Sequence, residues 1–139
     1  MVVGAGDTAA EEATYLSKLC NKVTILVRKD YMRASKAMIH RVNNTPNIEV
    51  KFNHELIGIE DENSLVERAV SINNQTQEVT KIDVHGIFIA IGHKPNTDIF
   101  KGQITLEENG YIITKPNTCL TNLPGVFAAE NIQEHIYKK

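Results

Sequence analysis

The first residues whose spacing could do chemistry are two glycines near the amino end of the chain. Gly4 and Gly6, with Ala9 three residues further on, follow an apolar start and precede a helical pattern. Small residues at this spacing let a pyrophosphate approach the backbone and lie at the positive end of a helix dipole. An ordinary tight turn has the same pattern, but the flanking strand and helix patterns favour dinucleotide binding.

The residue types after the second predicted strand indicate which dinucleotide this turn would bind. An NAD site places an acidic residue about twenty positions after the glycines, where it binds the ribose 2′-hydroxyl. This sequence has Arg28 and Lys29 there, and Arg33 follows. Three cations at one place can hold a 2′-phosphate, which predicts NADPH rather than NADH as the cofactor. The alternative is a solvated basic stretch that Asp30 partly neutralises.

Other reactive side chains give weaker arguments. His93 follows a predicted central strand, at the edge where open α/β sheets bind ligands, but a surface loop histidine explains it equally well. The histidines show no metal-binding spacing. Cys20 and Cys119 are too far apart in the sequence to form a CxxC pair. We therefore expect neither a metal site nor a redox dithiol within this chain.

The composition limits the classes of partner. Among 139 residues, 15 Lys and Arg stand against 17 Asp and Glu, which gives a formal net charge of −2. This balance does not favour nucleic acid or an anionic membrane surface as a partner. No apolar run has the length of a membrane span, and the first residues lack the layout of a signal peptide. We therefore expect a cytoplasmic protein with one modest globular domain.

The hydrophobic periodicity predicts the elements that position these residues. Apolar runs predict three buried parallel strands, the last of them central, over residues 1–3, 23–27 and 86–92. Helical spacing predicts two helices, over residues 8–20 and 35–43. In the first helix, Thr8 and Glu11 have the spacing of a capping box.

Between the second helix and the last strand, the apolar pattern alternates with a period of two. The alternating segments are residues 48–52, 54–59, 66–72 and 78–84. We interpret them as an antiparallel meander inserted into the parallel fold. The whole pattern predicts an α/β fold: a three-layer Rossmann-like NADP(H)-binding domain with a parallel central sheet and an antiparallel β-meander.

Five segments together carry a resemblance to a known family. They are residues 2–12 (VVGAGDTAAEE), 27–35 (VRKDYMRAS), 86–100 (GIFIAIGHKPNTDIF), 109–112 (NGYI) and 123–129 (LPGVFAA). They resemble the bacterial low-molecular-weight thioredoxin reductases, in which hydride passes from NADPH to FAD and electrons then pass to a CxxC disulfide. The resemblance implies that residues 1–125 are the NADPH-binding domain of a thioredoxin-disulfide reductase. Residues 126–139 are then a remnant of the returning flavin-domain segment.

The resemblance also implies roles for single residues. The implied cofactor-binding residues are Gly4, Gly6, Asp7, Thr8, Glu11, Arg28, Lys29, Arg33, Ile91, Gly92 and His93. The first five belong to the pyrophosphate turn and its helix, the three cations to the 2′-phosphate, and the last three to the nicotinamide half. The family usually has two arginines in the basic pair, so Lys29 keeps the charge but lacks the planar fork.

Two departures from the family pattern concern the flavin. The family's CxxC dithiol lies just upstream of the glycine turn, and this sequence starts after that place. The family's flavin motif ends in Ala-Ala-Gly-Asp, whereas this chain has Glu130 and Asn131 as the last two residues. We therefore expect FAD in the complete enzyme only, with thioredoxin and a flavin domain as partners there. The isolated chain is expected to lack reductase activity and to expose apolar faces that favour a homo-oligomer.

Two alternatives stay open at this point. The chain could be a catalytically inactive, truncated nucleotide-binding module that binds NADP(H) weakly or not at all. It could also be a domain of a related flavoprotein disulfide reductase, such as a peroxiredoxin reductase.

Overall fold

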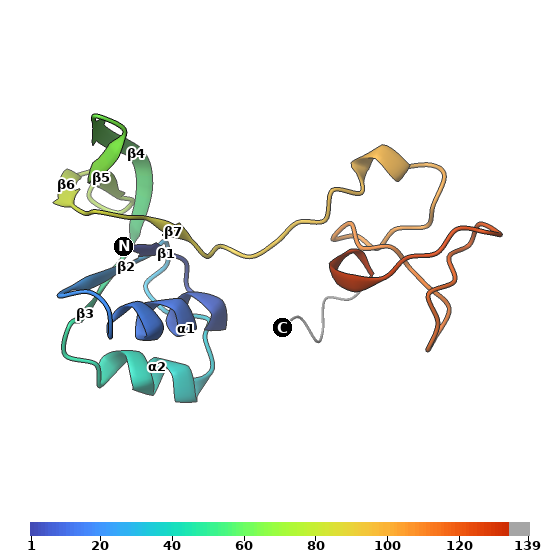
Figure 1. The fold of residues 1–139 in the computed structure, drawn as a ribbon, viewed down its shortest axis with the longest axis horizontal. Helices are drawn as coiled ribbons and strands as arrows, with labels where there is room; N and C mark the ends of the chain where they lie inside the picture. The colour runs from blue at the N-terminus through green and yellow to red at the C-terminus, as the bar shows by residue number, and fades with distance from the viewer. Residues whose placement is uncertain (134–139) are drawn as a thin grey trace. The chain divides into compact units, whose positions relative to one another are not determined.

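The computed structural model describes residues 1–133. They belong to two compact units, the first ending at Gly92 and the second beginning at His93, and not to the single domain expected from the length. Within residues 1–133, every α-helix and every named β-strand belongs to the first unit (Figure 1). In chain order they are β1 (Val2–Val3), α1 (Asp7–Leu16), β2 (Val23–Val27), α2 (Lys36–Asn43), β3 (Ile48–Phe52), β4 (His54–Glu62), β5 (Leu65–Asn73), β6 (Val79–Asp83) and β7 (Phe88–Ile89). No helix within residues 1–133 is both long enough and apolar enough to cross a membrane.

The strands of the first unit form two sheets. Four parallel strands have the order β3-β2-β1-β7, and three antiparallel strands have the order β4-β5-β6. The helices α1 and α2 lie together on one side of the parallel sheet, and the antiparallel sheet lies on the other side (Figure 1). The predicted three-layer α/β fold is therefore confirmed.

The middle layer holds the unit together because β2 is buried on both faces. All five of its residues are buried, as expected for a parallel strand covered on both sides. Ile25 packs in the core that α1 contributes to, whereas the next residue, Leu26, packs against Ala69 and Val84 of the meander side. Successive side chains of a strand point to opposite faces, so one short strand joins both cores.

Two predicted strands have a different place in the structure. β3 was expected in the meander, but it pairs with β2 in parallel along its whole length. The run 86–92 was expected to be a buried central strand, but it contributes only β7 at the edge of the sheet. There Phe88 and Ile89 are 46% and 58% exposed. Alternation and hydrophobicity report how polar each face is, but neither pattern specifies the neighbouring strand.

The first helix also differs from its prediction. It begins at Asp7 with Gly6 as its N-cap, and no side chain caps it, so the expected capping box of Thr8 and Glu11 does not form. It ends at Leu16 rather than near residue 20. The amides of Lys18 and Leu19 bond three residues back, which tightens the chain after the helix. The second helix begins and ends as predicted, with the hydroxyl of Ser35 accepting from the Met38 amide.

The second unit begins at His93 and has a small core of its own. Its buried core cluster consists of Ile104, Ile112 and Ala128. Within residues 93–133, the regular structure comprises two 3-10 helices, η1 (Asp98–Phe100) and η2 (Glu130–Ile132), and two isolated bridges. The boundary expected after residue 125, between the NADPH-binding domain and the remnant of the flavin domain, stays a prediction. Of the segment 126–139, residues 134–139 lie outside the described residues.

Gly4 is the residue on which the path of the first turn depends. A Cβ atom there would lie 2.2 Å from the Ala90 carbonyl oxygen and 2.9 Å from the Ala9 Cβ. Since the Ala90 oxygen belongs to the backbone, Gly4→Ala is expected to lower the free energy of unfolding by at least about 2 kcal/mol in urea denaturation.

Gly6→Ala provides the matched control. A Cβ at Gly6 would meet no atom within 4 Å, so this variant is expected to lose less than about 1 kcal/mol, from the poorer N-cap. Equal stability losses in the two variants would contradict this account of the turn.

Candidate functional site

The turn between β1 and α1 has the geometry of an anion-binding turn. Gly6 has φ −91° and ψ −176°, which other residues also adopt, and the space beside it is open. Neither the backbone conformation nor the packing of the chain therefore requires glycine at this position. A ligand that approaches the backbone of the turn closely would require it, because a side chain would fill the open space. The first amides of α1 have no side-chain cap, so they remain available to such a ligand.

The segment that follows β2 is bound to this turn through its backbone. The carbonyl oxygen of Ala5 accepts hydrogen bonds from the amides of Arg33, at 2.7 Å, and Ala34, at 3.0 Å. Met32 and Ala34 are buried in the helix-side core, whereas Arg33 between them is exposed. Because the side chains before and after Arg33 are buried, the Arg33 side chain must point into solvent, beside the glycine turn.

The meander binds the same segment at its other end. The amide of Asn53 donates to the carbonyl oxygen of Lys29 at 3.1 Å. The side-chain amide of Asn74 donates to the carbonyl oxygen of Arg28 at 2.7 Å and to Glu55 Oε1 at 3.3 Å. Backbone groups of the basic segment are thus used within the fold, while its charged side chains remain exposed.

A cleft of about 470 Å³ opens where these elements meet. Its lining comprises residues from the glycine turn, the basic segment, β4 and the end of the parallel sheet: Val3, Gly4, Ala5, Leu26, Arg28, Arg33, His54, Glu55, Leu56, Ile89 and Ile91. It lies at the carboxyl ends of β1 and β2, which is where open α/β sheets bind ligands.

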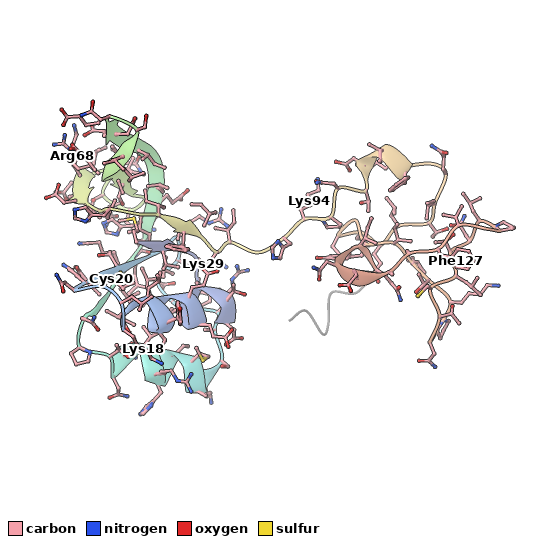
Figure 2. All side chains as sticks on the ribbon, in the orientation of Figure 1. Lys18, Cys20, Lys29, Arg68, Lys94 and Phe127 are labelled. Atoms are coloured by element: carbon pink, nitrogen blue, oxygen red, sulfur yellow. The ribbon has the colours of Figure 1, made fainter. Side chains whose placement is uncertain are left out.

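The cations of this site are not neutralised by acidic side chains. Within residues 1–133, Arg28, Lys29 and Arg33 form no ion pair, whereas lysines elsewhere, such as Lys22 and Lys51, do. Lys29, which is labelled in Figure 2, instead donates to the hydroxyl of Tyr31 at 2.9 Å. Its Nζ lies 5.1 Å from the centre of the Tyr31 ring. Unpaired cations beside uncapped helix amides have the charge and the donors that an anion needs.

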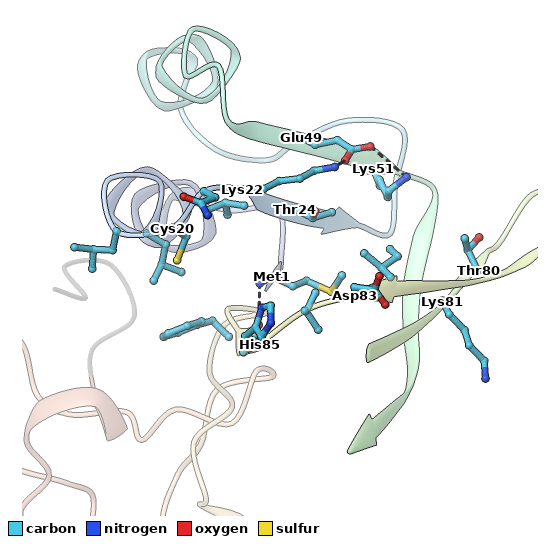
Figure 3. A pocket seen from close by; sticks show the side chains of 18 residues that line it. Met1, Cys20, Lys22, Thr24, Glu49, Lys51, Thr80, Lys81, Asp83 and His85 are labelled. Atoms are coloured by element: carbon cyan, nitrogen blue, oxygen red, sulfur yellow. Dashed lines mark hydrogen bonds and ion pairs between the residues drawn. The ribbon is translucent and has the colours of Figure 1, made fainter. Parts of the chain in front are cut away.

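A larger cavity of about 920 Å³ lies elsewhere in the first unit and lacks these features. It is lined by Met1 and Val23, at the amino ends of β1 and β2, and by residues of β6 (Figure 3). Lys22 and Lys51 face it, but both are paired with Glu49, at 2.7 and 3.2 Å. The hydrogen bond from Lys22 lowers the pKa of the Glu49 carboxyl. Size alone would select this cavity, but its lysines, Lys22, Lys51 and Lys81, are all paired with glutamates.

Four of the eleven predicted site residues, Gly4, Arg28, Arg33 and Ile91, line the cleft. The other predicted residues of the first unit lie at the start of α1, on its exposed side, beside the cleft or at the end of the unit: Gly6, Asp7, Thr8, Glu11, Lys29 and Gly92. His93 is exposed and is the first residue of the second unit, so its predicted role stays a prediction. Within residues 1–133, no group of three His, Cys, Asp or Glu residues could hold a metal ion.

Several residues of the site were not identified from the sequence. Asn74 and the pair His54 and Glu55 come from the meander, far along the chain from the basic segment. No local pattern marks them, because their proximity depends on how the two sheets stack. The alternation of Met32 and Ala34 with the polar residues Tyr31, Arg33 and Ser35 was a usable signal, since it is the period of an extended segment with one buried side.

Comparison with protein families and sequences gives a consistent result. The family model described as pyridine nucleotide-disulphide oxidoreductase matches residues 1–137. The chain is 45% identical over 139 residues to a thioredoxin reductase of Dictyostelium discoideum, and 46% identical over 139 residues to one of Chlamydia pneumoniae. These alignments cover 100% and 99% of this chain, but only 43% and 44% of the relatives.

Solved structures of thioredoxin reductases are also similar. The Lactococcus lactis enzyme superposes with a TM-score of 0.85 at 31% identity, and the Giardia duodenalis enzyme with a TM-score of 0.76 at 36% identity. Each comparison covers 99% of this chain and 45% of the other. The chain thus spans less than half the length of the proteins it resembles.

The contact between the meander and the basic segment can be tested by Asn74→Ala. The variant loses the hydrogen bonds to the Arg28 carbonyl and to Glu55, so it is expected to lower the free energy of unfolding by about 1 kcal/mol. Hydrogen exchange at the Asn53 amide, which donates to Lys29, should become faster. Gln75→Ala, which loses an exposed contact in the same turn, should stay within about 0.5 kcal/mol of the wild type. Unchanged exchange at Asn53 in Asn74→Ala would show that the meander does not hold this segment.

Proposed function

We propose that this chain, which belongs to the pyridine nucleotide-disulphide oxidoreductase family, binds NADP(H) as part of a thioredoxin-disulfide reductase. In the complete enzyme it would present the nicotinamide to an FAD held by a flavin domain outside these residues. When bound, the nicotinamide supplies a hydride to the flavin. Thioredoxin would be the final partner, and the enzyme would work in the cytoplasm.

The observation that carries this proposal is the unpaired charge of Arg28, Lys29 and Arg33 beside an uncapped helix start. A cluster of like charges costs free energy in the free protein unless an anion neutralises it. A 2′-phosphate has the charge and the acceptor oxygens that two guanidinium groups and an ammonium group bind. The open space at Gly6 gives the pyrophosphate room to approach the backbone. The residues present thus fit NADP(H).

The remaining residues would bind the other parts of the cofactor. The amides at the start of α1, with Gly4 and Thr8, would bind the pyrophosphate, and Glu11 would lie beside it. Ile91 and Gly92, at the end of the first unit, would orient the nicotinamide half together with His93. Ile91 is 66% exposed, so it has apolar surface available for a ring.

One observation favours the alternative of a nucleotide-binding module without flavin chemistry of its own. Glu130 has φ +62°, a conformation that suits glycine and costs other residues about 1 kcal/mol or more. It stands where the resembling family has glycine, and Asn131 stands where that family has the carboxylate that binds the flavin. These residues do not fit FAD, so we assign them no role in holding it.

Two variants separate the two parts of the proposed site. Wild-type chain is expected to bind NADPH between about tenfold and a thousandfold more tightly than NADH, from partly screened charge-assisted contacts. Replacing Arg28 and Lys29 with alanine should remove most of this preference and leave NADH affinity nearly unchanged. Gly6→Val should weaken both cofactors alike, because it fills the space that the shared pyrophosphate needs.

Calorimetric titration with each cofactor measures these affinities, and thermal unfolding checks that each variant is folded. Added salt should reduce the wild-type preference, since salt screens exposed charges. If the double variant weakens NADH and NADPH equally, or if salt leaves the preference unchanged, the basic segment is only a solvated turn.

A further inference from the structure

We propose that Asp7 is a positioning residue that sets the preference for NADPH by fixing the backbone from which Arg33 projects. The proposal rests on the proposed function, because it concerns how the same site distinguishes its two cofactors. Asp7 acts through the protein in this account, without touching the phosphate.

The contacts of Asp7 differ from those of a ligand-binding carboxylate. Its Oδ1 accepts a hydrogen bond from the amide of Ser35 at 2.8 Å, across the gap between the glycine turn and the start of α2. The two preceding amides, of Arg33 and Ala34, donate to the Ala5 carbonyl. Three consecutive amides therefore bind one turn, and the third of these bonds depends on the residue type at position 7.

The charge of Asp7 supports a role in positioning. An anionic side chain at the start of α1 is near the site proposed for an anionic pyrophosphate, so its charge opposes cofactor binding there. The hydrogen bond from Ser35 lowers the pKa of the Asp7 carboxyl, so the side chain is ionised at neutral pH. A charge-assisted hydrogen bond is stronger than a neutral one, so the ionised Asp7 holds the segment that carries Arg33 more firmly than a neutral side chain would.

The segment between the two anchors explains why Arg33 is the residue affected. Buried Met32 and Ala34 flank Arg33, and Ser35, the N-cap of α2, follows Ala34. Releasing the Ser35 amide loosens the start of α2 and weakens the anchor on the carboxyl side of Arg33 to the two bonds that Ala5 accepts, whereas Arg28 stays bound through Asn74. The loss should therefore fall on the 2′-phosphate contact of Arg33 and spare the pyrophosphate turn.

Two substitutions at position 7 separate the hydrogen bond from the charge. Asp7→Asn keeps an oxygen that can accept from Ser35 and removes the charge. It should bind both cofactors somewhat more tightly and keep the NADPH preference within about twofold of the wild type. Asp7→Ala removes the acceptor as well, so its NADPH preference should fall about fivefold while NADH affinity does not fall.

Control variants test a nearby negative charge, that of Asp30, and the hydrogen-bond donor, the amide of Ser35. Asp30→Ala removes an exposed carboxylate from the same basic segment that makes no hydrogen bond within residues 1–133, so it should not lower the preference. Ser35→Pro removes the hydrogen bond from the donor side, at a φ of −59° that proline adopts, and should reproduce the effect of Asp7→Ala. Ser35→Ala keeps the amide and separates the loss of the hydroxyl from the loss of the donor. The donor-side variant also keeps the test valid if Asp7→Ala does not fold.

The measurement is calorimetric titration of each folded variant with NADPH and with NADH. A fall in preference in Asp7→Ala and Ser35→Pro, with Asp7→Asn near the wild type, supports the proposal. If wild-type chain prefers NADPH and Asp7→Ala keeps that preference, or if Asp7→Ala weakens both cofactors alike, the positioning role is overturned and the proposed function stands. If wild-type chain shows no preference for NADPH, both are overturned.

Discussion

The hydrogen bonds that the carbonyl oxygen of Ala5 accepts from Arg33 and Ala34 are the contact on which the rest of the site depends. They join the turn after β1 to the segment after β2, so the two parts of the proposed cofactor site share one backbone frame. The turn can take this path because Gly4 has no Cβ, which would lie 2.2 Å from the Ala90 carbonyl oxygen. A larger residue at Gly4 would displace the carbonyl that holds the basic segment.

The three layers supply the other constraint. β2 is buried on both faces, so the residues that follow it leave the sheet between the helices and the meander. The meander then binds the carbonyl oxygens of Arg28 and Lys29 through Asn74 and Asn53. Backbone polar groups of the segment are satisfied within the fold, and its cations remain free for an external anion.

Much of this could be predicted from the sequence where the signal is local. The glycine turn, β2, α2 and the antiparallel strands follow from residue type and period, and the three cations follow from their place after β2. The position of β3 in the parallel sheet and of β7 at its edge could not be predicted, because periodicity does not specify the neighbouring strand. The same limit applies to Asn74, whose partner Arg28 is brought near by the stacking of two sheets. The capping box expected from Thr8 and Glu11 does not form, because the N-cap of α1 is Gly6 and no side chain caps the helix amides.

If one backbone frame holds two adjacent anion sites, amide chemical-shift mapping of the wild-type chain with 2′,5′-ADP and with 5′-AMP will distinguish them. These ligands differ only in the 2′-phosphate. We expect both to shift the amides at the start of α1, and 2′,5′-ADP alone to shift strongly the amides of residues 28–35. If both ligands give the same shifts, or if the shifts fall on residues that line the larger cavity, such as Lys22 and Glu49, the assignment of the site is wrong.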